Sequence, residues 1–200
     1  NVNNERSNAV HTFTTQPGVL GFGVPTDPSI RYTWAHPPNA GEVPQPTEGA
    51  SCVVLNSSCF LVFGGRGDFT EWDTLHLGCN ALDGVEVAWA MLWPPGRENT
   101  PSPRQRAGVA VVRGALVGVL EADDVLLLVG GSSGSVWLAD AWAFSLPPAA
   151  PAWRALPQLP HAASSTPVIF TTWTGASEGE GQQAVVVQTT AMEEGSGGVD

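Results

Sequence analysis

The stretch Phe60-Leu61-Val62-Phe63-Gly64-Gly65 decides how this chain is built, because the same arrangement returns at Leu126-Leu127-Leu128-Val129-Gly130-Gly131. In both places an apolar run ends in a glycine pair, and the two pairs lie 66 residues apart (130 − 64). Each pair precedes a polar loop, an Asp-led alternating segment and then a tryptophan. These segments are Asp73 to Leu77 with Trp89, and Asp140 to Phe144 with Trp153. An internal repeat of this length predicts a repeat architecture.

Partial copies of the unit lie on either side of the two full copies. Upstream, Asn8-Ala9-Val10-His11 matches Asp73-Thr74-Leu75-His76, and Tyr32-Thr33-Trp34 supplies the tryptophan segment. Downstream, apolar runs at 166–170 and 184–187 match the first two strands of a unit, without a glycine pair after them.

An apolar strand ending in Gly-Gly, a loop, an alternating strand and a Trp-bearing strand resemble the kelch motif, whose units are the four-stranded blades of a β-propeller. The resemblance implies an all-β fold with two complete blades, 37–93 and 94–157. Residues 1–36 would be the second half of a preceding blade, and 158–200 a degenerate first half of a further blade with a flexible acidic tail. The positions expected to be structural are Gly64, Gly65, Gly130, Gly131, Trp34, Trp89 and Trp153.

The number of repeat units predicts that the chain is a fragment of a larger propeller. Propellers close with about four to eight blades, and a repeat unit buries its faces only between neighbours. The alternative is a free-standing β-sandwich.

Composition also favours an all-β fold. The chain has 23 glycines and 17 prolines, which separate short Val-, Leu- and Ala-rich runs. The best helix candidate, 107–119, lacks a capping residue and is rich in Val and Gly. We expect a strand there, then a turn at Arg113-Gly114 and a further extension.

The charge of the chain limits its partners. Eight arginines and no lysine stand against 19 acidic residues, so the net charge is −11. This balance argues against nucleic acid and against an anionic membrane surface. No apolar stretch reaches the roughly 18 to 20 residues of a membrane span.

The three cysteines, Cys52, Cys59 and Cys79, have no metal-like spacing. In the expected hairpin Cys52 faces Val62 and Cys59 faces Leu55, which places these two cysteines too far apart for a disulfide. Three free thiols predict a reducing compartment and a cytoplasmic location, although a fragment can have lost a signal peptide. The sequon Asn56-Ser57-Ser58 would matter only in a secreted protein.

Catalytic patterns are missing from the sequence. There is no His-x-Glu, Cys-x-x-Cys or Gly-x-Ser-x-Gly, and Gly21-Phe22-Gly23 lacks the rest of a dinucleotide loop. The single tyrosine, Tyr32, argues against the copper-radical site of some kelch-like oxidases. His11 and His76 share one repeat position, which favours a structural role. We expect no catalytic, metal or cofactor site in this segment.

A binding face is expected where the loops between blades meet the loops between the second and third strands. The kelch resemblance implies that partners bind there. The residues assigned to this site are Arg66, Asp68, Trp93, Arg97, Arg104 and Arg106. Among the eight tryptophans, Trp72 and Trp93 are the two candidates for exposed anchors, the alternative being that they pack inside the fold. Since a guanidinium donates paired hydrogen bonds to anions, a partner with an acidic or phosphorylated segment is expected. Alternatively, Arg104 pairs with Glu98 or Glu71 and holds the loops.

These expectations favour a non-catalytic protein–protein interaction module, a kelch-type scaffold or adaptor propeller. An alternative is a substrate-positioning propeller domain of a larger enzyme whose catalytic domain lies outside this segment. A third reading is a secreted adhesin that uses Arg66-Gly67-Asp68.

Overall fold

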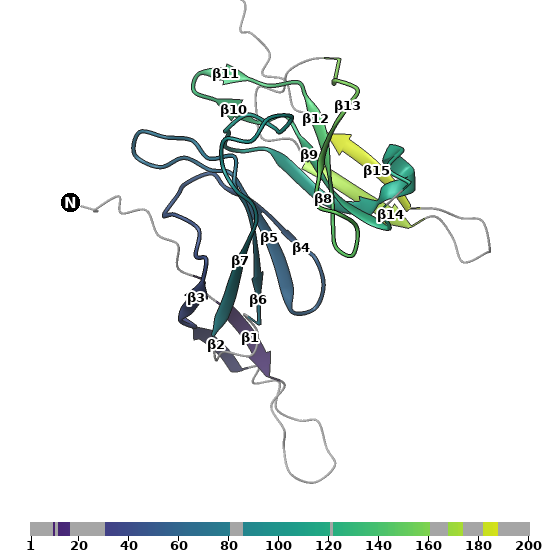
Figure 1. The fold of residues 1–200 in the computed structure, drawn as a ribbon. Coiled ribbons are helices and arrows are strands. Elements are labelled where there is room, and N and C mark those ends of the chain that lie inside the picture. Colours follow the sequence, from purple (N-terminus) through teal and green to yellow (C-terminus); the bar gives the residue numbers. More distant parts are fainter. Residues whose placement is uncertain are drawn as a thin grey trace, which may run out of the picture.

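The computed structural model describes Val10 and residues 12–16, 31–80, 86–120, 122–160, 168–173 and 182–187. These residues form sheets that are antiparallel except for one parallel pair, and their helical part is one 3-10 turn, η2 (Gly114–Val117). The all-β prediction is therefore confirmed (Figure 1).

The first large sheet is a meander with one added strand. Strands β4 (Ser51–Val54), β5 (Cys59–Phe63), β6 (Leu75–Cys79) and β7 (Val87–Trp93) are antiparallel neighbours in chain order. A fifth strand, β3 (Asn39–Gly41), pairs parallel to β7 at the outer edge. The sequence predicted four strands here, so β3 is an addition.

The second large sheet repeats the meander. It contains β8 (Gly108–Arg113), β9 (Asp124–Val129), β12 (Ala141–Ser145) and β13 (Trp153–Leu156) in the same relative order. A two-stranded hairpin, β10 (Ser132–Ser133) and β11 (Val136–Trp137), occupies the loop between β9 and β12. The strand and turn expected over 107–119 are present, but η2 follows the turn in place of an extension.

A two-stranded sheet comes before these two sheets in the sequence, and another follows them. Strands β1 (Thr12–Gln16) and β2 (Arg31–Ala35) form one pair, and β14 (Val168–Trp173) and β15 (Gln182–Val187) form the other. The strands expected from Tyr32-Thr33-Trp34 and from the two C-terminal apolar runs are therefore present.

The backbone repeats itself at the glycine pairs. The Gly64 amide donates to the Thr74 carbonyl at 3.1 Å, and the Gly130 amide donates to the Asp140 carbonyl at 2.9 Å. The φ angles are 67° and 98° in the first pair and 58° and 95° in the second, a region in which a Cβ is strained. The glycine pairs therefore end equivalent strands, β5 and β9, as predicted.

The matching of Asp73 with Asp140 is wrong by one residue. The hydrogen bonds of the glycine pairs make Thr74 the counterpart of Asp140, since both donor and acceptor are 66 residues apart. Asp73 instead accepts a hydrogen bond from the Gly96 amide at 3.0 Å. The two aspartates therefore hold different loops.

Trp89 and Trp153 occupy equivalent positions, as predicted. Trp89 lies opposite Gly78 and Trp153 opposite Phe144, and these partners are again 66 residues apart. The Trp89 indole donates to the side chain of Asn39 at 2.9 Å, whereas that of Trp153 has no partner among the described residues. The side chain of Trp34 lies outside the described part of the chain.

The core lies on both faces of each large sheet. Alternation along β5 sends Leu61 and Phe63 toward the second sheet, and Phe60 and Val62 into a cluster with Trp89. Along β9, Leu126 and Leu128 belong to the cluster that the two sheets share. The residues on the other face of β9 pack into a separate cluster with Val119. Both large sheets therefore carry buried residues on both faces, although Cys52 and Val54 of β4 remain exposed.

Candidate functional site: the loop face

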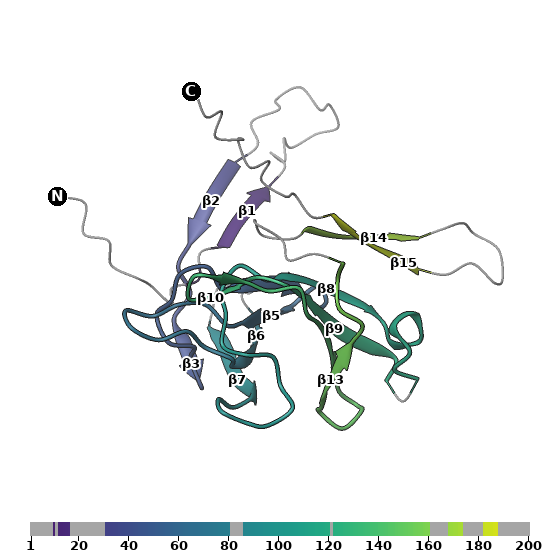
Figure 2. The ribbon, with the colours of Figure 1, turned by 90° about the horizontal axis from the view of Figure 1, so that it is seen from above.

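The loops that follow β5, β7 and β9 lie together at one end of the sheets. We call this surface the loop face and define it as residues 46–49, 64–72, 94–107 and 130–138. Arg66 forms backbone bridges with both Glu48 and Glu71, and the Glu71 carboxylate accepts a hydrogen bond from the Gly134 amide at 2.9 Å. The structure thus brings loops of both repeats together, with β10 and β11 at the same end (Figures 1 and 2).

Arg104 is enclosed within this surface. Its side chain is 0 % exposed, and its guanidinium donates to both Asp140 oxygens, at 2.6 and 2.7 Å. Further bonds reach the Gly130 carbonyl at 2.9 Å and the Ser102 carbonyl at 3.0 Å. The expectation that Arg104 meets a partner is not supported, because no part of the guanidinium is exposed. The alternative, in which Arg104 pairs with a carboxylate and holds the loops, is confirmed, with Asp140 in place of Glu98 or Glu71.

Asp140 is the acidic half of this pair. Burial by itself would raise its pKa, but the hydrogen bonds and charge of Arg104, with a hydrogen bond from the Trp142 indole at 2.7 Å, outweigh that effect and lower the pKa. The carboxylate therefore stays ionised and links the start of β12 to the loop that enters β8.

Trp93 is buried, although the sequence analysis assigned it to the binding face. It is 9 % exposed and meets Phe144 of the other sheet edge-to-face, with ring centroids 5.8 Å apart. The Arg97 guanidinium lies 4.8 Å from the centre of the Trp93 ring, where a cation–π contact is favourable. Trp93 therefore packs against the Arg97 guanidinium and does not protrude into solvent. Trp72 is half-buried and does not protrude either.

Four of the predicted site residues are exposed on the loop face. Arg66, Asp68, Arg97 and Arg106 all present side chains to solvent. Beside them stands Phe69, which is 100 % exposed and was missed by the sequence reasoning. The sequence feature that could have identified it is an aromatic residue inside a polar loop, directly after Gly67-Asp68.

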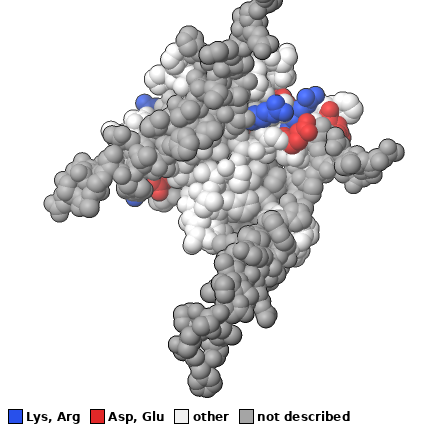
Figure 3. All heavy atoms as spheres, turned by 180° about the vertical axis from the view of Figure 1, so that it is seen from behind, with Lys and Arg blue, Asp and Glu red and all other residues white. Residues whose placement is uncertain are grey.

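The charges of this surface are mixed. Glu48 and Glu71 flank Arg66 in the backbone bridges. Where charged side chains gather in Figure 3, acidic and basic groups touch one another. The loop face is therefore not a continuous basic patch.

The described residues offer little for metal or acid–base chemistry. They contain no group of three or more His, Cys, Asp and Glu placed to hold a metal ion. His76 lies buried in β6, and burial lowers its pKa despite the charge of Glu42. His36 is exposed, and His11 and His161 lie outside the described residues. No helix in the described part is long and apolar enough to cross a membrane.

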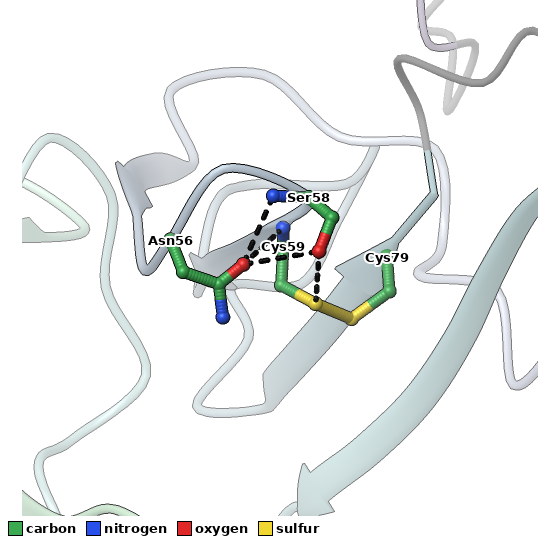
Figure 4. Close-up of a disulfide and its surroundings, with 4 residues drawn as sticks. All are labelled: Asn56, Ser58, Cys59 and Cys79. Carbon is green, nitrogen blue, oxygen red and sulfur yellow. Dashed lines mark hydrogen bonds between the residues drawn. A yellow bond between two sulfur atoms is a disulfide. The ribbon is translucent and has the colours of Figure 1, made fainter.

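The expectation of three free thiols is wrong. Cys59 and Cys79 lie directly opposite each other on β5 and β6 and form a disulfide (Figure 4). Cys52 is free and exposed. The sequence analysis considered only the pair Cys52 and Cys59. The register Phe63 opposite Leu75 would have paired Cys59 with Cys79. The cytoplasmic location was inferred from three free thiols. Without them it remains a prediction that the structure does not test.

In comparisons with known proteins, no family model matches the chain, and no curated protein matches it.

Proposed function

We propose that this chain is a segment of a kelch-type β-propeller and that it acts as a non-catalytic protein–protein interaction module through the loop face. The proposal combines an architecture argument with one surface observation.

The burial of residues on the two faces of each large sheet supports the propeller architecture. In a free-standing sandwich each sheet covers one face and leaves the other to water. Here both large sheets carry buried residues on both faces, and the first strands β4 and β8 pack against one another while β7 and β13 lie on the outer sides. Sheets that follow one another with their first strands adjacent are what consecutive blades require.

The observation that carries the binding proposal is the full exposure of Phe69 on a braced loop. The loop is held by the Gly67 amide bonded to the Thr70 carbonyl at 2.7 Å and by the Arg66 bridges. An aromatic ring held out by a rigid loop loses little entropy on binding, and such rings are enriched among binding hot spots.

The surroundings of Phe69 suggest the chemistry of the partner. Arg66, Arg97 and Arg106 are exposed on the loop face and can each donate paired hydrogen bonds to an anion. We expect a protein partner that offers an apolar pocket for Phe69 and carboxylate or phosphate groups at its rim.

The test compares two exposed apolar residues at opposite ends of the sheets. Phe69→Ala should weaken binding of a partner recovered with the full-length protein at least about tenfold, as expected for a hot spot. Leu120→Ala is the matched control, because Leu120 is 81 % exposed in the loop that leads into β9, away from the loop face. Loss of affinity in the Leu120 variant with unchanged binding in the Phe69 variant would place the site at the other end.

A further inference from the structure

The turn between β4 and β5 carries the sequence Asn56-Ser57-Ser58. It is the sole Asn-x-Ser/Thr sequon without proline in the 200 residues, because Asn99-Thr100 is followed by Pro101. Asn56, Ser57 and Ser58 are all exposed. A sequon is an acceptor for an N-linked oligosaccharide when the chain passes through a compartment that attaches one.

The geometry of the turn presents the acceptor atom. The Asn56 side-chain oxygen accepts hydrogen bonds from the Ser58 amide and the Cys59 amide, both at 2.9 Å, and from the Ser58 hydroxyl at 3.2 Å. Three donors on one atom fix it as the oxygen of the amide. In Figure 4 the amide nitrogen, Nδ2, points away from the turn and carries none of the hydrogen bonds drawn.

A second, independent observation follows directly in the chain. Cys59, the residue after the sequon, is bonded to Cys79 across β5 and β6. Disulfides form and persist in oxidising environments such as the endoplasmic reticulum and the extracellular space, and are rare in cytosolic proteins. The same environments hold N-glycosylated proteins.

The site also has room. Val54, at the end of β4, is 70 % exposed, and Asn80, whose amide donates to the Ser58 carbonyl, is exposed too. Because β5 begins beside this turn and ends at Phe63, next to the loop face, the turn lies at the opposite end of the sheet from the loop face. An oligosaccharide there would leave the loop face uncovered.

We propose that Asn56 is an N-glycosylation site and that the protein matures in an oxidising, glycosylating compartment. This proposal takes the place of the cytoplasmic prediction and does not depend on the proposed binding function. In the reaction, Asn56 Nδ2 bonds to the anomeric carbon of a lipid-pyrophosphate-linked oligosaccharide. The bond from that carbon to the pyrophosphate oxygen breaks, the lipid pyrophosphate leaves, and Nδ2 gives up one proton to the transferase.

The decisive experiment is peptide mass spectrometry on the full-length protein isolated from the cells that make it. Since the chain has no lysine, trypsin releases the sequon in the peptide that runs from Tyr32 to Arg66. Amidase treatment in heavy-oxygen water should convert most of Asn56 to labelled aspartate. Alkylation without reduction should label Cys52 and leave Cys59 and Cys79 unlabelled.

Variants secreted from a glycosylating host test the role of the turn. Asn56→Gln and Ser58→Ala should abolish the oligosaccharide, and Ser58→Thr, which keeps the hydroxyl, should retain it. Asn99→Gln is the matched control and should leave occupancy unchanged. An unmodified Asn56 in the native protein would overturn the glycosylation proposal, and freely alkylated Cys59 and Cys79 would overturn the oxidising compartment as well.

Discussion

At the scale of single residues, Arg104 was expected to bind a partner, but it pairs with Asp140 inside the fold. The two are 36 residues apart in sequence and form a bidentate pair in which the arginine is fully buried. The same guanidinium also satisfies the carbonyl of Gly130, the first glycine of the second pair. The pair therefore fixes the loop before β8 to the start of β12, and the Arg104 backbone bonds in turn to Gly65 and Trp72 of the first repeat.

Arg104→Ala should lower the free energy of unfolding by about 3 kcal/mol, because removing one partner leaves a partly buried carboxylate without compensation. The matched control is Arg113→Ala. Its ion pair with Asp124, at 3.3 Å, is largely exposed and should contribute less than about 1 kcal/mol. Urea unfolding of both variants measures the difference, and equal losses would contradict a structural role for Arg104.

The same pair gives a dependence on pH. The pKa of Asp140 is lower in the folded chain than its ordinary value of 3.8, so its contribution to stability is present above that pH. It is lost as the pH falls through the folded-state pKa, when the carboxylate takes up a proton. Unfolding free energies measured from about pH 5 downward should therefore fall more steeply in the parent chain than in Arg104→Ala. Parallel curves would show that Arg104 does not lower this pKa.

The glycine pairs allow a second test at this scale. A Cβ at Gly64 would lie 2.4 Å from the Arg104 carbonyl oxygen, whereas one at Gly96 would meet nothing within 4 Å. Both glycines have similar φ angles, 67° and 72°. Gly96→Ala should then cost only the left-handed backbone term, about 1 to 2 kcal/mol, and Gly64→Ala should cost more. Chemical denaturation decides this, and equal costs would remove the steric role of the glycine pair.

At the scale of elements, the disulfide joins β5 and β6 at the end where the β4–β5 turn lies. Replacing Cys59 and Cys79 by serine should destabilise the chain by about 3 kcal/mol, because the bond closes a loop with a sequence separation of 20. Cys52→Ser, on the exposed free thiol, should change the stability little. Thermal melting with and without reductant checks this, and a parent chain indifferent to reductant would contradict it.

At the scale of the whole molecule, the two large sheets share one core. Phe144 is 0 % exposed and contacts Trp153 of its own sheet, with centroids 5.0 Å apart, and Trp93 of the other sheet. Phe63 completes the cluster by meeting Trp153 at 5.5 Å. This shared packing should make the two sheets unfold together.

Phe144→Ala should cost about 3 to 5 kcal/mol, as expected for a large buried aromatic side chain, and should lower the stability of both sheets in one transition. Phe69→Ala is the same substitution at a fully exposed site and should stay within about 0.5 kcal/mol. Amide hydrogen exchange, read separately over β5–β6 and β9–β12, distinguishes shared from separate unfolding. Unchanged protection of the first sheet would mean that the sheets are independent.

The sequence by itself determined the all-β class, the strands of both repeats and the place of the glycine pairs. These features depend on local chemistry, namely short apolar runs and backbone conformations that only glycine adopts at low cost. The equivalence of Trp89 and Trp153 followed from the same repeat.

The tertiary structure alone decided the partner of Arg104, the burial of Trp93, the fifth strand β3 and the disulfide between Cys59 and Cys79. Each depends on side chains brought together from distant positions, where a shift of one residue in register changes the neighbour. The tertiary structure also decided the exposure of Phe69, because an apolar ring is buried only where another part of the fold covers it. Local pattern therefore fixed the elements, while packing between them decided which residues stay available to a partner.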